Sequence, residues 1–214
     1  MIVVGIHATF GRCYLALLRT GHDPIVASHP QASSALPCGV FQLVDQASID
    51  PSGIDLLAVA RGPGSFTGIK VSISCAWGIS KALGVPLAGV GSLEALALAA
   101  APTPGETVVS LFPAYGGLVY AARCLIDGQG LPSVQGDPRV GPPSIVSALV
   151  GDNGRIILAG SVEEESIASV AVTRVDPGPV LALSVARLAE SDRAKGRPTP
   201  AEPLYLRADP AKAW

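Results

Sequence analysis

The loop RGPGSFTG, residues 61–68, has the glycine, serine and threonine content of segments that bind phosphate or carry a nucleophile. A Walker A loop places a lysine directly after its last glycine, whereas Lys70 comes two positions after Gly68. A nucleophile elbow has glycines two positions before and after its serine, but proline and threonine stand at those distances from Ser65. The spacing therefore excludes both chemistries.

The loop also differs from a dinucleotide-binding turn, because it reads GxGxxxG and the next acid, Glu94, is not at the ribose distance. The residues favour a joint between a strand and a helix. Its first two glycines allow a sharp turn, Ser65 or Thr67 caps the helix, and Gly68 allows close packing. Anion binding by the N–H groups at the helix start stays open. We define the motif loop as Gly62, Pro63, Gly64, Ser65, Phe66, Thr67 and Gly68.

The cysteines and histidines do not have the spacing of a metal site. The four cysteines lie far apart without a CxxC pair, and we expect them to be reduced, semi-buried thiols: Cys13, Cys38, Cys75 and Cys124. The three histidines are isolated, and we expect surface or turn positions for each: His7, His22 and His29. No metal site is predicted. For the acids Asp55 and Glu94, the sequence favours a strand entrance and the first turn of a helix, and leaves a general-base role open.

The composition is poor in charge and rich in apolar residues. Lys and Arg number 15 against 17 for Asp and Glu, so the chain lacks the basic excess of a nucleic-acid-binding protein. Charged residues form 15% of the chain, below the roughly 25% of an average soluble domain, and hydrophobic residues form 49%. This favours an apolar face covered by another chain, or else an alanine-rich composition without such a face. The N-terminal segment resembles neither a signal peptide nor a membrane span, so a cytoplasmic location is expected.

Hydrophobic periodicity predicts a mixed sheet covered by helices in the order βββαβαβα. The expected strands are Met1–Ile6, Cys13–Leu18, Pro24–Ala27, Ile54–Ala60 and Val85–Val90. The expected helices are Ser33–Ser48, Thr67–Leu83 and one that starts at Ser92. The segment Ala101–Gly105 interrupts the periodicity, which divides the chain into domains 1–103 and 104–214. Residues 108–123 repeat the strand, turn and strand pattern of residues 2–17, as in a duplicated fold.

The predicted helix Thr67–Leu83 is apolar around nearly its full circumference. One stripe can face its own sheet, and the other needs cover from a partner helix or from the second domain of the chain. We favour a partner, which would bind this helix and Ser33–Ser48. The predicted interface comprises Leu36, Val40, Val44, Ile69, Lys70, Val71, Ile73, Cys75, Trp77 and Ile79.

Four stretches resemble the bacterial TsaB (YeaZ) family of tRNA threonylcarbamoyladenosine biosynthesis. They are residues 55–60, RGPGSFTGIK (61–70), GVPLAGVGSLEALA (84–97) and PLYLR (203–207). The resemblance implies an α/β fold of two RNase-H-like lobes of the actin-like and sugar-kinase superfamily, the second lobe being reduced. It implies a non-catalytic subunit without a cofactor, which pairs with the catalytic paralogue TsaD and is joined by the ATPase TsaE. A homodimer when alone, and contact with tRNA only through the complex, are also implied.

The first hairpin departs from that family, which has Asp-Thr-Ser where this chain has His7, Ala8 and Thr9. In nucleotide-using relatives, the acid at this place helps to hold hydrated magnesium. The alternative function is an ATP-dependent phosphotransferase or ATPase of the same superfamily, which would require carboxylates on the hairpin turns. None occurs between Met1 and Asp23 or between Glu106 and Asp127.

Overall fold

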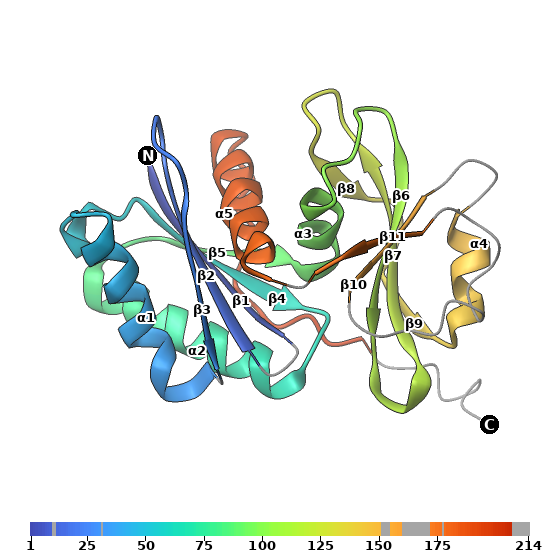
Figure 1. Cartoon of the computed structure of the whole chain (residues 1–214), viewed down its shortest axis with the longest axis horizontal. Coiled ribbons are helices and arrows are strands. Elements are labelled where there is room, and N and C mark those ends of the chain that lie inside the picture. Colours follow the sequence, from blue (N-terminus) through green and yellow to red (C-terminus); the bar gives the residue numbers. More distant parts are fainter. Residues whose placement is uncertain (10–11, 31, 151–154, 160–171, 177, 207–214) are drawn as a thin grey trace. The chain divides into compact units, whose positions relative to one another are not determined.

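The structure is a computed structural model that describes residues 1–9, 12–30, 32–150, 155–159, 172–176 and 178–206 (Figure 1). Its contacts divide the chain into two compact units. Unit 1 comprises Met1–Ala95 and Pro177–Leu204, and unit 2 comprises Leu96–Asp176 and Tyr205–Trp214. Both units contain a mixed sheet with helices, which confirms the predicted fold class.

Unit 1 is built on a five-stranded sheet in the order β3-β2-β1-β4-β5. Its strands are β1 (Ile2–Thr9), β2 (Arg12–Arg19), β3 (Ile25–Pro30), β4 (Leu56–Gly62) and β5 (Leu87–Gly91). The first three are antiparallel neighbours, whereas β4 and β5 run parallel to β1. The carboxyl ends of β1, β4 and β5 therefore meet at one edge, where the motif loop begins.

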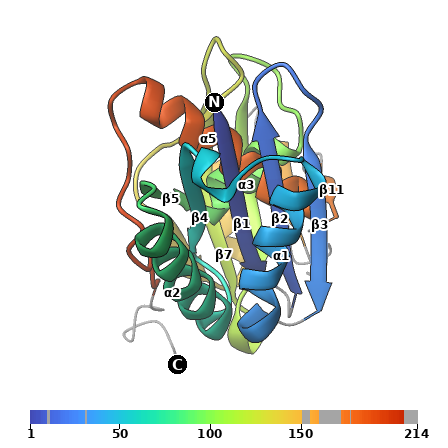
Figure 2. The same ribbon diagram turned by 90° about the vertical axis from the view of Figure 1, so that its left-hand side faces the viewer.

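Helices cover both faces of this sheet. The helices α1 (Ala32–Gln46) and α2 (Phe66–Leu83) pack on the face that presents Val4 and Ile6, and Figure 2 shows them in front of the strands. Helix α5 (Pro179–Ala194) packs on β1 and β2 from the opposite face. A Cβ on Gly5 would lie 2.2 Å from the carbonyl oxygen of Ala182 in α5. Because side chains alternate along a strand, both sides of β1 are buried.

Unit 2 repeats the strand arrangement of unit 1. Its sheet has the order β11-β10-β6-β7-β8, with β9 also pairing with β7. The strands are β6 (Thr107–Pro113), β7 (Val119–Ile126), β8 (Pro132–Val134), β9 (Arg139–Gly141), β10 (Arg155–Ala159) and β11 (Val172–Val175). As in unit 1, an antiparallel hairpin is followed outward by parallel strands on one side. This confirms the predicted repeat of the opening hairpin.

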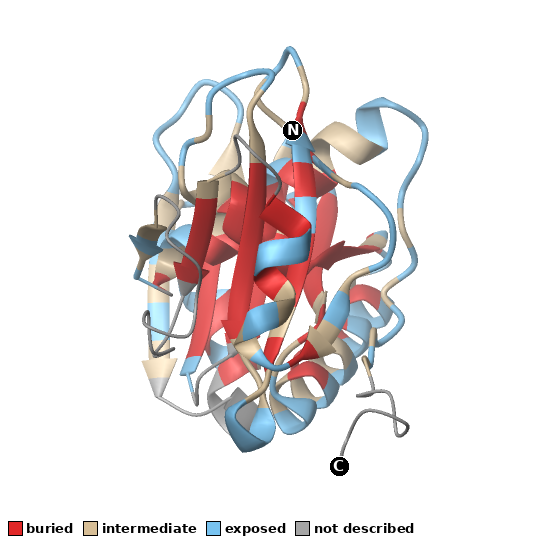
Figure 3. Cartoon of the chain, turned by 90° about the vertical axis from the view of Figure 1, so that its right-hand side faces the viewer, coloured by how far each residue is buried: buried red, intermediate tan, exposed pale blue. Residues whose placement is uncertain are grey.

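Short helical segments accompany the sheet of unit 2. They are the short helix α4 (Ser147–Val150) and the 3-10 turns η2 (Tyr115–Gly117) and η3 (Pro143–Val146), and η1 (Pro51–Gly53) belongs to unit 1. Leu149 and Val150 of α4 pack with buried residues of β6, β7 and β10. Figure 3 shows buried residues concentrated along the central strands. The boundary between unit 1 and unit 2, after Ala95, lies within helix α3 (Ser92–Ala99).

The contact-based units differ from the division predicted at residues 103 and 104. Unit 1 ends at Ala95 in the first part of the chain, and it regains residues 177–204 near the end. The physical reason is the apolar stripe of α5, because Leu181 and Val185 are fully buried on the sheet of unit 1. Sequence order alone gives no signal for this return.

Candidate protein-binding face on helix α2

The motif loop joins β4 to α2 through backbone features that the sequence predicted. Gly62 has a φ of +109°, a conformation that favours glycine, and a Cβ there would lie 2.6 Å from the carbonyl oxygen of Leu204. The hydroxyl of Ser65 caps α2 by accepting from the amide of Gly68 at 3.3 Å. A Cβ on Gly68 would lie 2.7 Å from the carbonyl oxygen of Ala8. The loop is thus a tight joint between β4 and α2, and it packs closely against two other segments of the same polypeptide, at Ala8 and Leu204.

Two backbone amides at the start of α2 donate hydrogen bonds to Ser65 of the same loop. The amide of Gly68 bonds the Ser65 hydroxyl, and the amide of Ile69 bonds the Ser65 carbonyl at 2.9 Å. What the loop presents outward is the ring of Phe66, which is 56% exposed. The ammonium of Lys70 lies 4.2 Å from the centroid of that ring. This geometry suits contact with a protein surface better than a phosphate cradle.

Half of the predicted interface is buried inside unit 1. Five of its side chains are in the interior of the unit: Leu36, Val40, Val44, Ile69 and Ile79. Ile73 and Cys75 are partly buried against the same core, and Val71 is half-buried. The prediction that these residues form an open docking surface is therefore wrong for this structure. The reason is that α1 packs beside α2, so the second apolar stripe of α2 is covered by a neighbouring helix of its own unit.

The exposed side of α2 carries a different row of residues. Lys70 and Trp77 of the predicted interface are exposed and belong to it. We define the aromatic stripe as Phe66, Lys70, Ser74, Trp77 and Lys81, which are all exposed and repeat at helical spacing. Trp77 is 57% exposed, and the ammonium of Lys81 lies 5.3 Å from its ring centroid. Large aromatic side chains are enriched at protein interfaces, and tryptophan is enriched at their hot spots.

His7 lies in the interior rather than on the surface, so the prediction for this histidine is wrong. It shares a face of β1 with Gly5, which is the face covered by α5, and it is fully buried. Burial lowers the pKa of His7 to about 3. His22 is exposed and His29 is half-buried. A neutral imidazole therefore occupies the position where the sequence resemblance placed an acid.

Asp55 and Glu94, for which the sequence left a general-base role open, lie at a strand entrance and in the first turn of a helix. The carboxylate of Asp55 accepts a hydrogen bond from the amide of Ile2 at 2.7 Å, which ties the entrance of β4 to β1. Glu94 lies in the first turn of α3, where burial raises its pKa, the positive charge of Arg61 opposes that rise and the charge of Asp192 adds to it. Both positions agree with the sequence analysis.

The described part of the chain contains neither a candidate metal site nor a candidate membrane span. Within residues 1–9, 12–30, 32–150, 155–159, 172–176 and 178–206, no group of three or more His, Cys, Asp or Glu side chains could hold a metal ion. No helix in these ranges has the length and apolar character needed to cross a bilayer. None of the four cysteines, all of which the structure describes, forms a disulfide: Cys13 and Cys124 are buried, Cys75 is half-buried and Cys38 is exposed.

Comparison with known proteins identifies the family. The family model for TsaD, tRNA N6-adenosine threonylcarbamoyltransferase, matches residues 20–140, which is more than half of the chain. The tRNA threonylcarbamoyladenosine biosynthesis protein TsaB of Bacillus subtilis is 30% identical over 112 residues, which cover 50% of this chain and 47% of that protein. The structure of YeaZ from Pseudomonas aeruginosa has a TM-score of 0.77 and 26% identity, and the match covers 95% of this chain and 100% of that chain. The chain belongs to the TsaD family and, within it, to the TsaB (YeaZ) group.

A more distant structure shows how far the fold extends beyond the TsaB group. The ROK hexokinase from Thermus thermophilus has a TM-score of 0.56 at 14% identity, over 92% of this chain and 100% of that chain. This likeness shows the actin-like and sugar-kinase fold. The TsaD-family match includes the motif loop, α2 and the β6–β7 hairpin. It starts at residue 20, so the first hairpin with His7 lies outside the matched stretch.

Proposed function

We propose that this chain is a non-catalytic subunit in the biosynthesis of threonylcarbamoyladenosine in tRNA, and that it binds a TsaD-type threonylcarbamoyltransferase. The observation that carries the proposal is the aromatic stripe on α2. Its two rings remain exposed although α2 already buries an apolar stripe in its own unit. A helix that is packed against its own unit on one side and exposes aromatic rings on the other side is suited to binding a second protein.

The chemistry of the first hairpin supports the non-catalytic part of the proposal. The described residues of this hairpin, 1–9 and 12–19, contain no carboxylate side chain. His7 cannot replace one, because its imidazole is buried and its pKa of about 3 keeps it neutral at physiological pH. A neutral buried ring does not attract hydrated magnesium in the way that an acid does.

The slight excess of acidic over basic residues supports contact with tRNA through a partner protein rather than directly. Fifteen basic residues against 17 acidic ones do not provide the positive surface that binds a phosphate backbone. In our proposal the TsaD-type partner, joined by a TsaE-type ATPase, makes the contacts with tRNA. Without that partner, the aromatic stripe would be covered by a second copy of the chain in a homodimer. A cytoplasmic location, where tRNA is modified, is part of the same proposal.

The test is association of the purified chain with a TsaD-type protein from the same genome. Phe66→Asp and Trp77→Asp place a charge on the aromatic stripe, and each should weaken association by about 30-fold or more, as loss of a hot-spot side chain does. Calorimetry or sedimentation measures the affinity. Tyr115→Asp is the matched control, because Tyr115 is 97% exposed and lies in unit 2.

Two results would contradict the proposal. Unchanged association of both stripe variants, with circular dichroism like that of the unmodified chain, would exclude the stripe as the docking face. Micromolar binding of magnesium-ATP by the isolated chain would instead favour the ATP-dependent enzyme of the same superfamily.

A further inference from the structure

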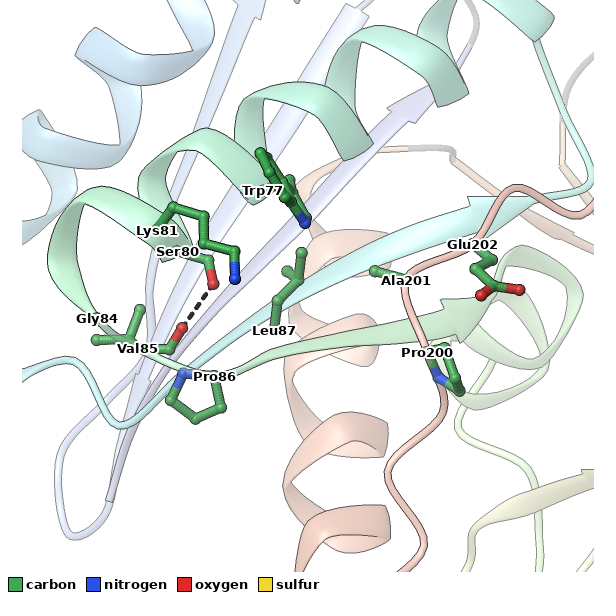
Figure 4. A pocket seen from close by; sticks show the side chains of 10 residues that line it. All are labelled: Trp77, Ser80, Lys81, Gly84, Val85, Pro86, Leu87, Pro200, Ala201 and Glu202. Carbon is green, nitrogen blue, oxygen red and sulfur yellow. Dashed lines mark hydrogen bonds between the residues drawn. The ribbon is translucent and has the colours of Figure 1, made fainter.

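A groove lies beside the aromatic stripe, between the second half of α2 and a segment near the end of the chain. We call residues Thr199–Leu204 the strap, and Figure 4 shows three of them, Pro200, Ala201 and Glu202, on the wall opposite Trp77. The groove has a volume of about 710 Å³. Its lining residues are Trp77, Ser80, Lys81, Gly84, Val85, Pro86, Leu87, Pro200, Ala201 and Glu202, all of them in unit 1.

The α2 wall of the groove is fixed by the turn that ends the helix. Gly84 terminates α2 with a φ of 69° in the left-handed region, which glycine adopts at little cost. The Ser80 hydroxyl donates to the carbonyl of Val85 at 2.6 Å (Figure 4). This bond holds the start of β5 against the helix, so that Leu87 forms the floor between the two walls.

The strap wall is held by a backbone hydrogen bond at each of its two ends. The amide of Gly89 donates to the Thr199 carbonyl at 2.8 Å, and the amide of Leu204 donates to the Arg61 carbonyl at 2.7 Å. A Cβ on Gly89 would lie 2.4 Å from the carbonyl oxygen of Pro200. The strap therefore lies directly on the sheet, and the groove is a built feature of unit 1.

Opposite charges stand on opposite walls of this groove. Lys81, on α2, holds its ammonium above the Trp77 ring, and the carboxylate of Glu202 lies on the strap. Among the residues that the structure describes, Glu202 is exposed and forms no ion pair. Between the two charges, apolar side chains share the lining with the hydroxyl of Ser80, and the indole nitrogen of Trp77 points toward the groove floor (Figure 4). An occupant must match this pattern of cation, apolar floor, N–H donor and anion.

We propose that the groove receives a segment of the same protein partner that binds the aromatic stripe. That segment presents an apolar side chain above Leu87, an acidic group to Lys81 and a basic group to Glu202. The inference rests on the proposed function, and it adds the strap to the docking face. Two observations favour a protein segment: Trp77 and Lys81 belong to both the stripe and the groove, and the rim charges are complementary to a peptide that carries both signs.

The experiment uses the full chain with Trp214→Phe, which leaves Trp77 as its one tryptophan. A purified TsaD-type protein is the probe, and its affinity is measured by calorimetry. Glu202→Lys should weaken association by about fivefold or more, and the effect should shrink in high salt. Lys81→Glu should act in the same direction. Asp137→Lys is the matched control, since it makes the same change at an exposed acid of unit 2.

The outcomes separate this inference from the proposed function. If Trp77→Asp abolishes association while Glu202→Lys matches Asp137→Lys, the groove inference is overturned and the proposed function stands. If Phe66→Asp and Trp77→Asp both leave the affinity unchanged, the proposed function fails first. Partner-induced change in Trp77 emission, reduced by Glu202→Lys, supports the groove. An emission response to free aromatic metabolites but not to the partner would assign the groove to a small molecule and overturn the inference.

Discussion

At the scale of residues, α2 separates two kinds of apolar side chain. Ile69 and Ile79 are buried in the unit's own core, whereas Phe66 and Trp77 are more than half exposed and each carries a lysine over its ring. A cation above an exposed ring contributes about 0.5–1 kcal/mol, far less than burial of the ring would. The lysines therefore leave both rings more than half exposed to solvent.

His7 gives a prediction about acid stability. Its folded-state pKa of about 3 lies below the ordinary value of 6.5, so the unfolded chain binds the proton more readily. The contribution of neutral His7 to the free energy of unfolding is fully present above pH 6.5 and is lost as the pH falls from there toward 3. The free energy of unfolding should fall by up to about 1.4 kcal/mol for each pH unit in this window. Urea denaturation at a series of pH values measures it.

The control for this prediction is His7→Gln, which removes the titrating ring. The difference in unfolding free energy between the unmodified chain and the variant should narrow between pH 7 and pH 4.5. A difference that stays constant over this range would mean that His7 does not titrate on unfolding.

At the scale of elements, the contact between β1 and α5 depends on the missing side chain of Gly5. Its position opposite Ala182 and Ala186 lets the helix approach the strand closely. Gly5→Ala should therefore displace α5 and destabilise the chain by about 1–3 kcal/mol, as overpacking does, lowering Tm by several degrees. Differential scanning calorimetry measures the shift.

Gly128→Ala provides the comparison for Gly5→Ala. A Cβ at Gly128 meets no atom within 4 Å, and its φ is outside the range that disfavours alanine. Its Tm should stay within about a degree of the unmodified chain. Equal melting temperatures for the two variants would refute the close-approach argument.

The elements themselves were largely predictable from the sequence. Glycine and serine chemistry is local, so the turn at Gly62 and the Ser65 cap followed from the residues alone. Periodicity gave α2 within one residue of its observed start. Periodicity could not say which apolar stripe of α2 faces inward, because that depends on α1 packing beside it. The buried state of His7 was missed for the same reason, since its cover comes from α5.

At the scale of the whole molecule, the repeat of one strand arrangement in both units was predicted from two similar hairpins. The return of residues 177–204 to unit 1 was not predicted, because the local sequence of a segment does not show which distant segment it packs against. The groove was missed as well, since half of its wall comes from the strap. At this scale, the contacts that the sequence could not specify join residues more than 100 positions apart.

A chain that ends at Asp176 should fail to complete unit 1. It lacks Leu181, Val185 and Leu188 of α5, whose buried side chains contribute about 1.5–3 kcal/mol each, a large part of a typical total stability of 5–15 kcal/mol. We expect it to bind the dye ANS and to lose cooperative unfolding. A synthetic peptide of residues 177–206, added in trans, should restore both properties. Cooperative unfolding of the truncated chain alone would contradict the assignment of α5 to unit 1.

The discontinuity of unit 1 also sets an order of events during synthesis. Its first 95 residues leave the ribosome well before α5 and the strap, because the central part of unit 2 is translated in between. Until then, Tyr14 and Ala16 on the α5 side of the nascent sheet stay bare. That interval is when a chaperone would engage the growing polypeptide, and slowing translation through residues 96–176 would lengthen it.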